Sequence, residues 1–265
     1  MPKAALERTS TAPHWALLAL EPVRACYELV AALVSSRTEL PPGDGHPVVI
    51  FPGLGGDSLS TRPLRTLCGQ LGYAAYDWGR GQNTGPEGDP ERWFDALTRD
   101  VRELASPHDE PVSLIGWSLG GIYAREVAKR LGAAARQVIT LGTPFAGTPD
   151  ETNAVWLYRL LNGEHPPAGQ ALIERVSRPP RVPTTSIYTR SDGVVAWQAC
   201  IQDGPGSHVD HVEVKGSHCG LGWNPEVLEI VARKLSLHGG HRRTRRGSLR
   251  VRSKAGRAHP GVAGG

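Results

Sequence analysis

Long apolar runs and cysteines are both scarce in this sequence of 265 residues. No stretch approaches the roughly 20 apolar residues that a membrane-spanning helix requires. The apolar run from Trp15 to Leu20 is short, ends at Glu21 and leads to no small-residue cleavage site, so it does not resemble a secretory signal. We therefore expect a cytoplasmic protein with no transmembrane segment.

The cysteines exclude two classes of small scaffold. There are four of them, which is too few for a disulfide framework, and their spacing is not that of a zinc site: Cys26, Cys68, Cys200 and Cys219. A Cys200–Cys219 disulfide is one alternative, but two buried free thiols are favoured in a reducing cytosol.

Acidic residues are absent from the end of the chain. Residues 238–265 carry eight lysines and arginines, and without them the net charge of +4 falls to −4. A mildly acidic body argues against a nucleic-acid-binding domain. Because the tail is rich in glycine and arginine and poor in large apolar groups, we expect it to be disordered. It is either simply solvated or makes weak contact with RNA or an anionic lipid surface.

Short apolar runs alternate with helix-like segments through the middle of the sequence. Strands are expected at 47–51, 73–78, 112–117, 137–141, 184–189 and 211–214, and helices at 62–71, 92–105, 122–131 and 225–237. This alternation is typical of an α/β fold, with a mainly parallel sheet of about six strands covered by helices on both faces.

A leader helix is predicted before the sheet, from Pro22 to Ser36. Polar residues recur at helical spacing and leave an apolar face made of Val23, Tyr27, Val30, Ala31 and Val34. We expect this face to pack on the domain. A membrane-surface helix is less favoured, because its polar side is not enriched in lysine or arginine.

The chain therefore divides into three parts. Residues 1–45 form the leader helix and a linker, 46–237 the α/β domain, and 238–265 the basic tail. Within the domain, residues 144–183 interrupt the alternation, with one expected helix at 154–161, and form either a surface loop or a small cap over the site. The glycine-rich loop 79–90 follows the second strand, on the side of the sheet where ligands of such folds bind.

A G-x-S-x-G pattern, residues 116–120, lies between the third strand and the helix that follows it. A serine on such a turn is exposed at the end of the sheet, and its flanking glycines let strand and helix approach closely. The helix N-terminus favours negative charge beside the serine. Ser118 is thus a candidate nucleophile, although a glycine-rich turn alone could show the same pattern.

A nucleophilic serine needs a base, and the base needs an orienting carboxylate. Asp192 follows the strand that begins at Thr184, and His218 follows the next strand along the chain. Both are expected at the edge of the sheet where Ser118 lies. The order serine, acid, histidine is that of the hydrolases with a nucleophile elbow.

An oxyanion hole needs two backbone N–H groups. One is expected from Leu119, directly after the nucleophile, and the other from the loop after the first strand, with Leu54 preferred and Gly55 in reserve. This loop lacks the lysine and hydroxyl of a phosphate-binding loop.

Taken in order, these motifs resemble the lipase- and esterase-like branch of the α/β-hydrolase superfamily. The matching segments are 52–56, 116–121, 141–144, 191–195 and 216–218. The resemblance covers roughly Pro47 to Leu237 and implies the compact form of the fold, without the first two strands of the full sheet. Many lipases begin the oxyanion loop with histidine and glycine, whereas this chain has Pro52-Gly53.

The resulting prediction is a serine hydrolase that cleaves carboxylic esters through Ser118, His218 and Asp192, with no metal or organic cofactor. Its expected partner is a small-molecule ester, and no specific nucleic acid is expected. Trp117, Trp156 and Leu157 would line a pocket for the apolar acyl group of this ester. Core packing is an equal alternative for those three side chains. The alternatives for function are acyl transfer or thioester hydrolysis by the same triad, and a non-catalytic binding module.

Overall fold

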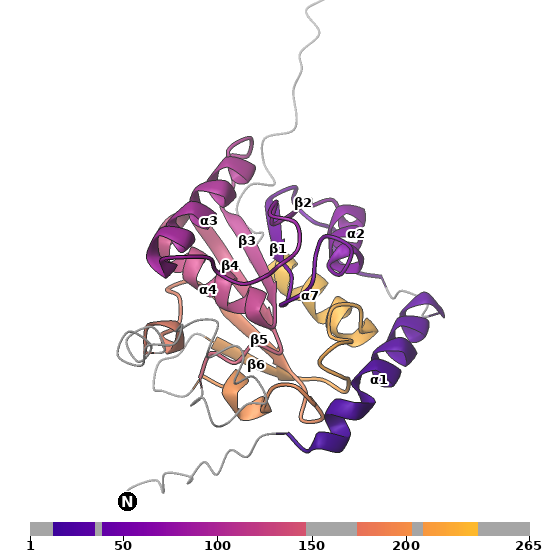
Figure 1. The fold of residues 1–265 in the computed structure, drawn as a ribbon. Helices are drawn as coiled ribbons and strands as arrows, with labels where there is room; N and C mark the ends of the chain where they lie inside the picture. Colours follow the sequence, from indigo (N-terminus) through magenta and orange to yellow (C-terminus); the bar gives the residue numbers. More distant parts are fainter. Residues whose placement is uncertain (1–12, 35–38, 147–173, 203–208, 238–265) are drawn as a thin grey trace, which may run out of the picture.

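A computed structural model of the chain describes residues 13–34, 39–146, 174–202 and 209–237 (Figure 1). Within them, six strands form one parallel sheet in the order β2-β1-β3-β4-β5-β6. The strands are β1 (Pro47–Phe51), β2 (Ala74–Asp77), β3 (Val112–Trp117), β4 (Ala135–Leu141), β5 (Thr184–Tyr188) and β6 (Val209–Glu213). The predicted mainly parallel sheet of about six strands is confirmed.

Helices cover both faces of the sheet, as Figure 1 shows. On one face α3 (Pro90–Ala105) and α4 (Leu119–Leu131) pack on alternate residues of β1, Val49 and Phe51. On the other, α2 (Arg62–Leu71) and α7 (Pro225–Leu237) pack on Val48 and Ile50. Because side chains alternate between the faces of a strand, a strand buried on both sides is apolar at successive positions. This burial explains the near-continuous apolar runs of the sequence.

The helix before the sheet, α1 (Trp15–Val34), differs from its prediction. It begins at Trp15 and contains Pro22, and the side expected to pack inward is exposed: Val23, Tyr27 and Val30 lie on the surface. Glu21 and Glu28 are buried against the domain instead. The predicted orientation is wrong, because these carboxylates bind backbone N–H groups of loops far along the chain, which local periodicity does not reveal.

Several predictions fall outside the described residues. They are the expected helix at 154–161, most of the segment interpreted as a loop or cap, and the basic tail.

Candidate active site

The predicted nucleophile lies on a strained turn. Strand β3 ends at Trp117 and α4 begins at Leu119, so Ser118 alone joins them. Its φ of 53° makes it the one non-glycine residue with positive φ among those the structure describes, and such backbone strain clusters at functional sites. A Cβ on Gly116 would collide with the Gly120 carbonyl, and one on Gly120 with that of Phe51. The glycines of the motif are therefore required by close backbone approach.

The predicted acid and base are in direct contact. Asp192 follows β5 and His218 follows β6, and Nδ1 of His218 lies 2.7 Å from Oδ2 of Asp192. The second carboxylate oxygen of Asp192 accepts hydrogen bonds from the N–H groups of Val194 at 2.8 Å and Val195 at 2.7 Å. Ser118, Asp192 and His218 are all buried. A carboxylate held in this way orients the ring and leaves Nε2 to handle the proton of a nucleophile.

The backbone of Ser118 and the ring of His218 both lie near the carboxyl end of β4. The N–H of Ser118 donates to the Leu141 carbonyl at 2.8 Å. A Cβ on the next residue, Gly142, would lie 3.0 Å from Nδ1 of His218. From the other side, the indole N–H of Trp117 donates to the His218 carbonyl at 3.1 Å. The structure thus gathers the three predicted residues at one edge of the sheet, as parallel strands require.

Two opposing influences act on the His218 ring. Burial is the largest and disfavours the charged ring, but the charge and hydrogen bond of Asp192, joined by the charge of Glu21, outweigh it. Together they raise the pKa of His218 above its usual 6.5. A base with a raised pKa takes up a proton more readily.

The loop expected to supply one oxyanion donor is held by Asn83. This buried residue donates from its side-chain amide to the Pro52 carbonyl at 2.8 Å, and its main chain exchanges hydrogen bonds with Gly55 and Gly56, each at 2.8 Å. The N–H of Gly55 is engaged in this exchange, which favours Leu54 over Gly55 as the donor. Sequence reasoning missed Asn83, although it lies in the loop 79–90 predicted on the ligand side.

Leu119, the other expected donor, opens α4. The first N–H groups of a helix have no acceptor within it and are free to bind an anion. Its side chain is buried in the core, so only its backbone can face a substrate.

Glu21 of α1 binds the loops that carry Asp192 and His218. One of its oxygens accepts from the N–H of Gly193 at 2.8 Å and from that of His218 at 3.1 Å, and the other accepts from Cys219 at 2.9 Å. A Cβ on Gly193 would collide with the backbone of Leu17, so this glycine lets α1 approach the acid loop. No pattern in the sequence pointed to Glu21.

Two further side chains extend this contact. Glu28 accepts from the N–H of Ser217 at 2.6 Å and from the Asn224 amide at 3.0 Å. Arg24 donates to the Ser191 carbonyl at 2.7 Å. All three charged residues of α1 are thus turned toward the loops that carry Asp192 and His218.

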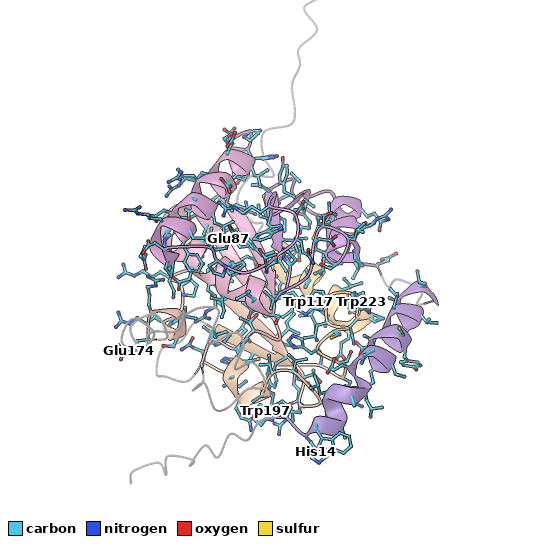
Figure 2. All side chains as sticks on the ribbon, in the orientation of Figure 1. His14, Glu87, Trp117, Glu174, Trp197 and Trp223 are labelled. Carbon is cyan, nitrogen blue, oxygen red and sulfur yellow. The ribbon has the colours of Figure 1, made fainter. Side chains whose placement is uncertain are left out.

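The proposed acyl-pocket residues are only partly described. Trp156 and Leu157 lie outside the described residues. Trp117 is buried and packs edge-on against Trp223, with ring centroids 5.6 Å apart, as their neighbouring positions in Figure 2 illustrate. With its hydrogen bond to His218, this packing gives Trp117 a supporting role, and its contact with substrate stays a prediction.

Serine, histidine and aspartate side chains also contact one another at the opposite end of the sheet, where β1 and β3 begin. Nε2 of His46 lies 2.8 Å from Oγ of Ser113, and Nδ1 contacts the Asp44 carboxylate, which also pairs with Arg136 at 2.6 Å. His46 and Ser113 are fully buried, and no nucleophile turn accompanies them. A substrate cannot reach this serine, so the arrangement is structural.

Cys200 and Cys219 are unpaired in the structure. Cys200 is buried as expected, whereas Cys219 is only partly buried. Among the described residues, no group of three or more His, Cys, Asp or Glu side chains is placed to hold a metal ion. In the same part of the chain, no helix combines the length and apolarity needed to cross a membrane.

Residues 48–245 match the Alpha/beta hydrolase family. The match covers most of the chain, so the protein belongs to this family. The helix α1, with Glu21, precedes the matched region. No curated protein matches the chain.

Solved structures agree on the fold. The chain resembles a monoacylglycerol lipase of Paleococcus ferrophilus at 17% identity and a TM-score of 0.54, covering 76% of this chain and 100% of that one. A structure from the metagenome-derived lipolytic enzymes LipS and LipT gives the same identity and score, with 76% and 96% covered. The pyrethroid hydrolase PytH is 16% identical, with a TM-score of 0.51 and 74% and 99% covered.

Proposed function

We propose that this protein is a serine hydrolase of carboxylic esters. The observation that carries the proposal is the buried contact of 2.7 Å between His218 and Asp192, in a loop that the residue before Ser118 contacts, together with the strained strand-to-helix turn at Ser118. An imidazole held by a carboxylate next to such a serine is the arrangement that nucleophilic acyl transfer requires.

In the proposed reaction, Ser118 Oγ attacks the ester carbonyl carbon while its proton passes to Nε2 of His218. The negative charge moves to the carbonyl oxygen, where the N–H groups of Leu54 and Leu119 stabilise it. Asp192 holds the ring and stabilises the imidazolium. When the tetrahedral intermediate collapses, His218 returns the proton to the departing alkoxide, and an acyl-Ser118 remains.

A water molecule then repeats the sequence. His218 takes its proton as the oxygen attacks the acyl carbon, and the second intermediate releases the carboxylic acid and restores Ser118. Every proton transfer uses the same ring nitrogen, so all the chemistry depends on the orientation of His218.

The proposed substrate is a small ester with an apolar acyl group. The names of the similar structures, a monoacylglycerol lipase and lipolytic enzymes among them, support ester chemistry for this fold. Their low identity leaves the acyl length and the alcohol to experiment.

The test is a panel of p-nitrophenyl esters of increasing chain length, assayed with wild type and Ser118→Ala. We expect wild type to release nitrophenol with one preferred length and Ser118→Ala to lose turnover and labelling by a fluorophosphonate probe. If Ser118→Ala matches wild type, or if no ester is turned over, the proposed function is wrong. Added alcohol or thiol acceptors that divert the acyl group from free acid would instead identify an acyltransferase.

A further inference from the structure

The side of α1 that does not contact the loops of Asp192 and His218 is almost wholly apolar. Its exposed large side chains, named here the outer apolar face, are Trp15, Leu18, Leu20, Val23, Tyr27, Leu29, Val30 and Leu33. Tyr27 is 75% and Leu33 78% exposed. Figure 1 shows α1 at the periphery of the molecule. A surface helix of a soluble domain normally buries such a stripe, so an exposed one marks an interaction site.

We propose that the outer apolar face of α1 docks on an anionic lipid surface, with the helix lying in the plane of the interface. The three charged residues of α1 are engaged with the catalytic loops and leave the outer face without a charge. The polar side of α1 is not enriched in lysine or arginine, which argued against a membrane-surface helix. This argument loses its force because that side is bound to protein.

The composition of the face suits a lipid interface. It combines aliphatic side chains with Trp15 and Tyr27, whose rings place an apolar body beside a polar group and settle at the level of lipid headgroups. A helix whose exposed face is apolar binds an interface in proportion to the apolar area that it inserts.

A neighbouring cavity extends the same surface. It measures about 620 Å³ and lies where α1, α2 and α7 meet. Leu29 and Leu33 of the outer apolar face form part of its wall, together with Leu59, Leu67 and Trp223. An acyl chain reaching up from the lipid surface would find apolar side chains here, although the wall also carries the charged residues Arg62, Glu226 and Glu229. A flat protein partner would leave this space empty.

Charge favours an anionic lipid. The sequence without residues 238–265 has a net charge of −4, whereas those residues carry eight basic side chains and no acidic one. A basic segment in a chain that also inserts an apolar face strengthens binding to anionic membranes, and the gain fades as salt screens it. The apolar face and the basic tail therefore supply the two signals that stable attachment needs.

The test is sedimentation of the full chain with sucrose-loaded vesicles of phosphatidylcholine, with and without phosphatidylglycerol. We expect wild type to sediment with the mixed vesicles and far less with phosphatidylcholine alone. The variant Val23→Ser/Tyr27→Ser/Leu33→Ser should bind the mixed vesicles roughly tenfold or more weakly. Leu237→Ser, which changes a 66% exposed leucine on α7, is the matched control and should bind as wild type does.

Circular dichroism and thermal melting check that each variant is folded. We expect an intact fold, because the substituted positions, Val23, Tyr27, Leu33 and Leu237, are all exposed. Tyr27→Ser alone changes one position instead of three, and should weaken binding to the mixed vesicles less than the triple variant does. The proposal is overturned if wild type stays in the supernatant, if the triple variant binds as tightly as Leu237→Ser, or if the two lipid compositions bind equally. A wild-type dimer that dissociates in the triple variant, seen by light scattering, would assign the face to a second copy instead. Sedimentation needs no turnover, so its result is independent of the proposed ester chemistry.

Discussion

Glu21 accepts a hydrogen bond from the backbone N–H of His218 at 3.1 Å, across a sequence separation of 197 residues. The same carboxylate binds Gly193, next to Asp192, at 2.8 Å. One side chain thus fixes the loops of the candidate acid and base relative to each other. Buried carboxylates that accept several backbone N–H groups are costly to disturb, because each donor would be left unpaired.

Glu21→Gln should lower kcat by about tenfold or more, because an amide has one acceptor oxygen for three N–H donors. It should also move the acid limb of the pH–rate profile to lower pH. His218 must be neutral to accept a proton, and the charge of Glu21 helps to raise its pKa above 6.5. Removing that charge lowers the pKa of His218 and extends activity into more acidic solution.

Glu229→Gln, at an exposed position paired with Arg233, is the control and should change neither quantity. A fall in kcat with no movement of the acid limb would mean that Glu21 acts on the fold alone.

Asn83→Ala should loosen the oxyanion loop. The variant loses the amide that donates to Pro52 and the oxygen that accepts from Gly85 and from the hydroxyl of Tyr123. Leaving these buried groups unpaired costs about 1–3 kcal/mol of unfolding free energy. Because the loop carries Leu54, we also expect kcat to fall while KM changes little. Urea denaturation and steady-state kinetics measure the two effects.

Gln82→Ala removes an exposed amide that donates to the Gly55 carbonyl and serves as the neighbouring control. Equal losses in the two variants would show that the buried network around Asn83 has no special part in holding the loop.

Gly120→Ala should destabilise the protein by about 3 kcal/mol or more, because the new methyl group would collide with the carbonyls of Phe51 and Pro52. Gly69→Ala is the matched substitution in α2, where nothing lies within 4 Å of the added Cβ. It should stabilise the protein by about 0.5–1 kcal/mol, since alanine loses less backbone entropy in a helix. Thermal melts of both variants test the contrast, and similar shifts in the two would refute it.

His46 should make the stability of the protein depend on pH in mildly acid solution. Burial is the main cause that lowers its pKa below 6.5, and the charge of Arg136 adds to burial, against the opposing effect of Asp44. The unfolded chain then takes up a proton that the folded one resists. The stability that neutral His46 contributes is present above pH 6.5 and is lost as pH falls below it.

Urea denaturation at pH 8 and pH 5.5 should therefore show a larger loss for wild type than for His46→Gln, which keeps a polar group near Ser113. If both proteins lose the same free energy, His46 does not cause the dependence.

Apolar runs and turn chemistry were enough to predict the sheet. The strands at 47–51 and 112–117 and the helices at 62–71 and 225–237 have the predicted bounds, and the other elements of the domain differ at their ends by a few residues. Helix α4, for example, starts at Leu119 rather than 122, because the turn at Ser118 leads directly into it. Local patterns sufficed here because the central strands are buried on both faces and therefore form near-continuous apolar runs.

The surroundings of the candidate site were less accessible to sequence reasoning. Asp192 and His218 were found through their place after a strand, and their contact follows from parallel topology. Glu21 and Asn83 act through backbone groups, and any residue type offers those. Their partners are therefore invisible in a single sequence, and for α1 the rule that apolar residues face inward gave the opposite orientation.

Helix α1 lies outside the family match, which matters when the match is used to choose the ends of a shortened protein. The match begins at residue 48, so a shortened gene designed on it would encode Ser118, Asp192 and His218 but not Glu21 or Glu28. The N–H groups of Gly193, Ser217, His218 and Cys219 would then lose the acceptors that they have in the full chain. An inactive product of that gene would reflect the cut, and would say nothing about Ser118.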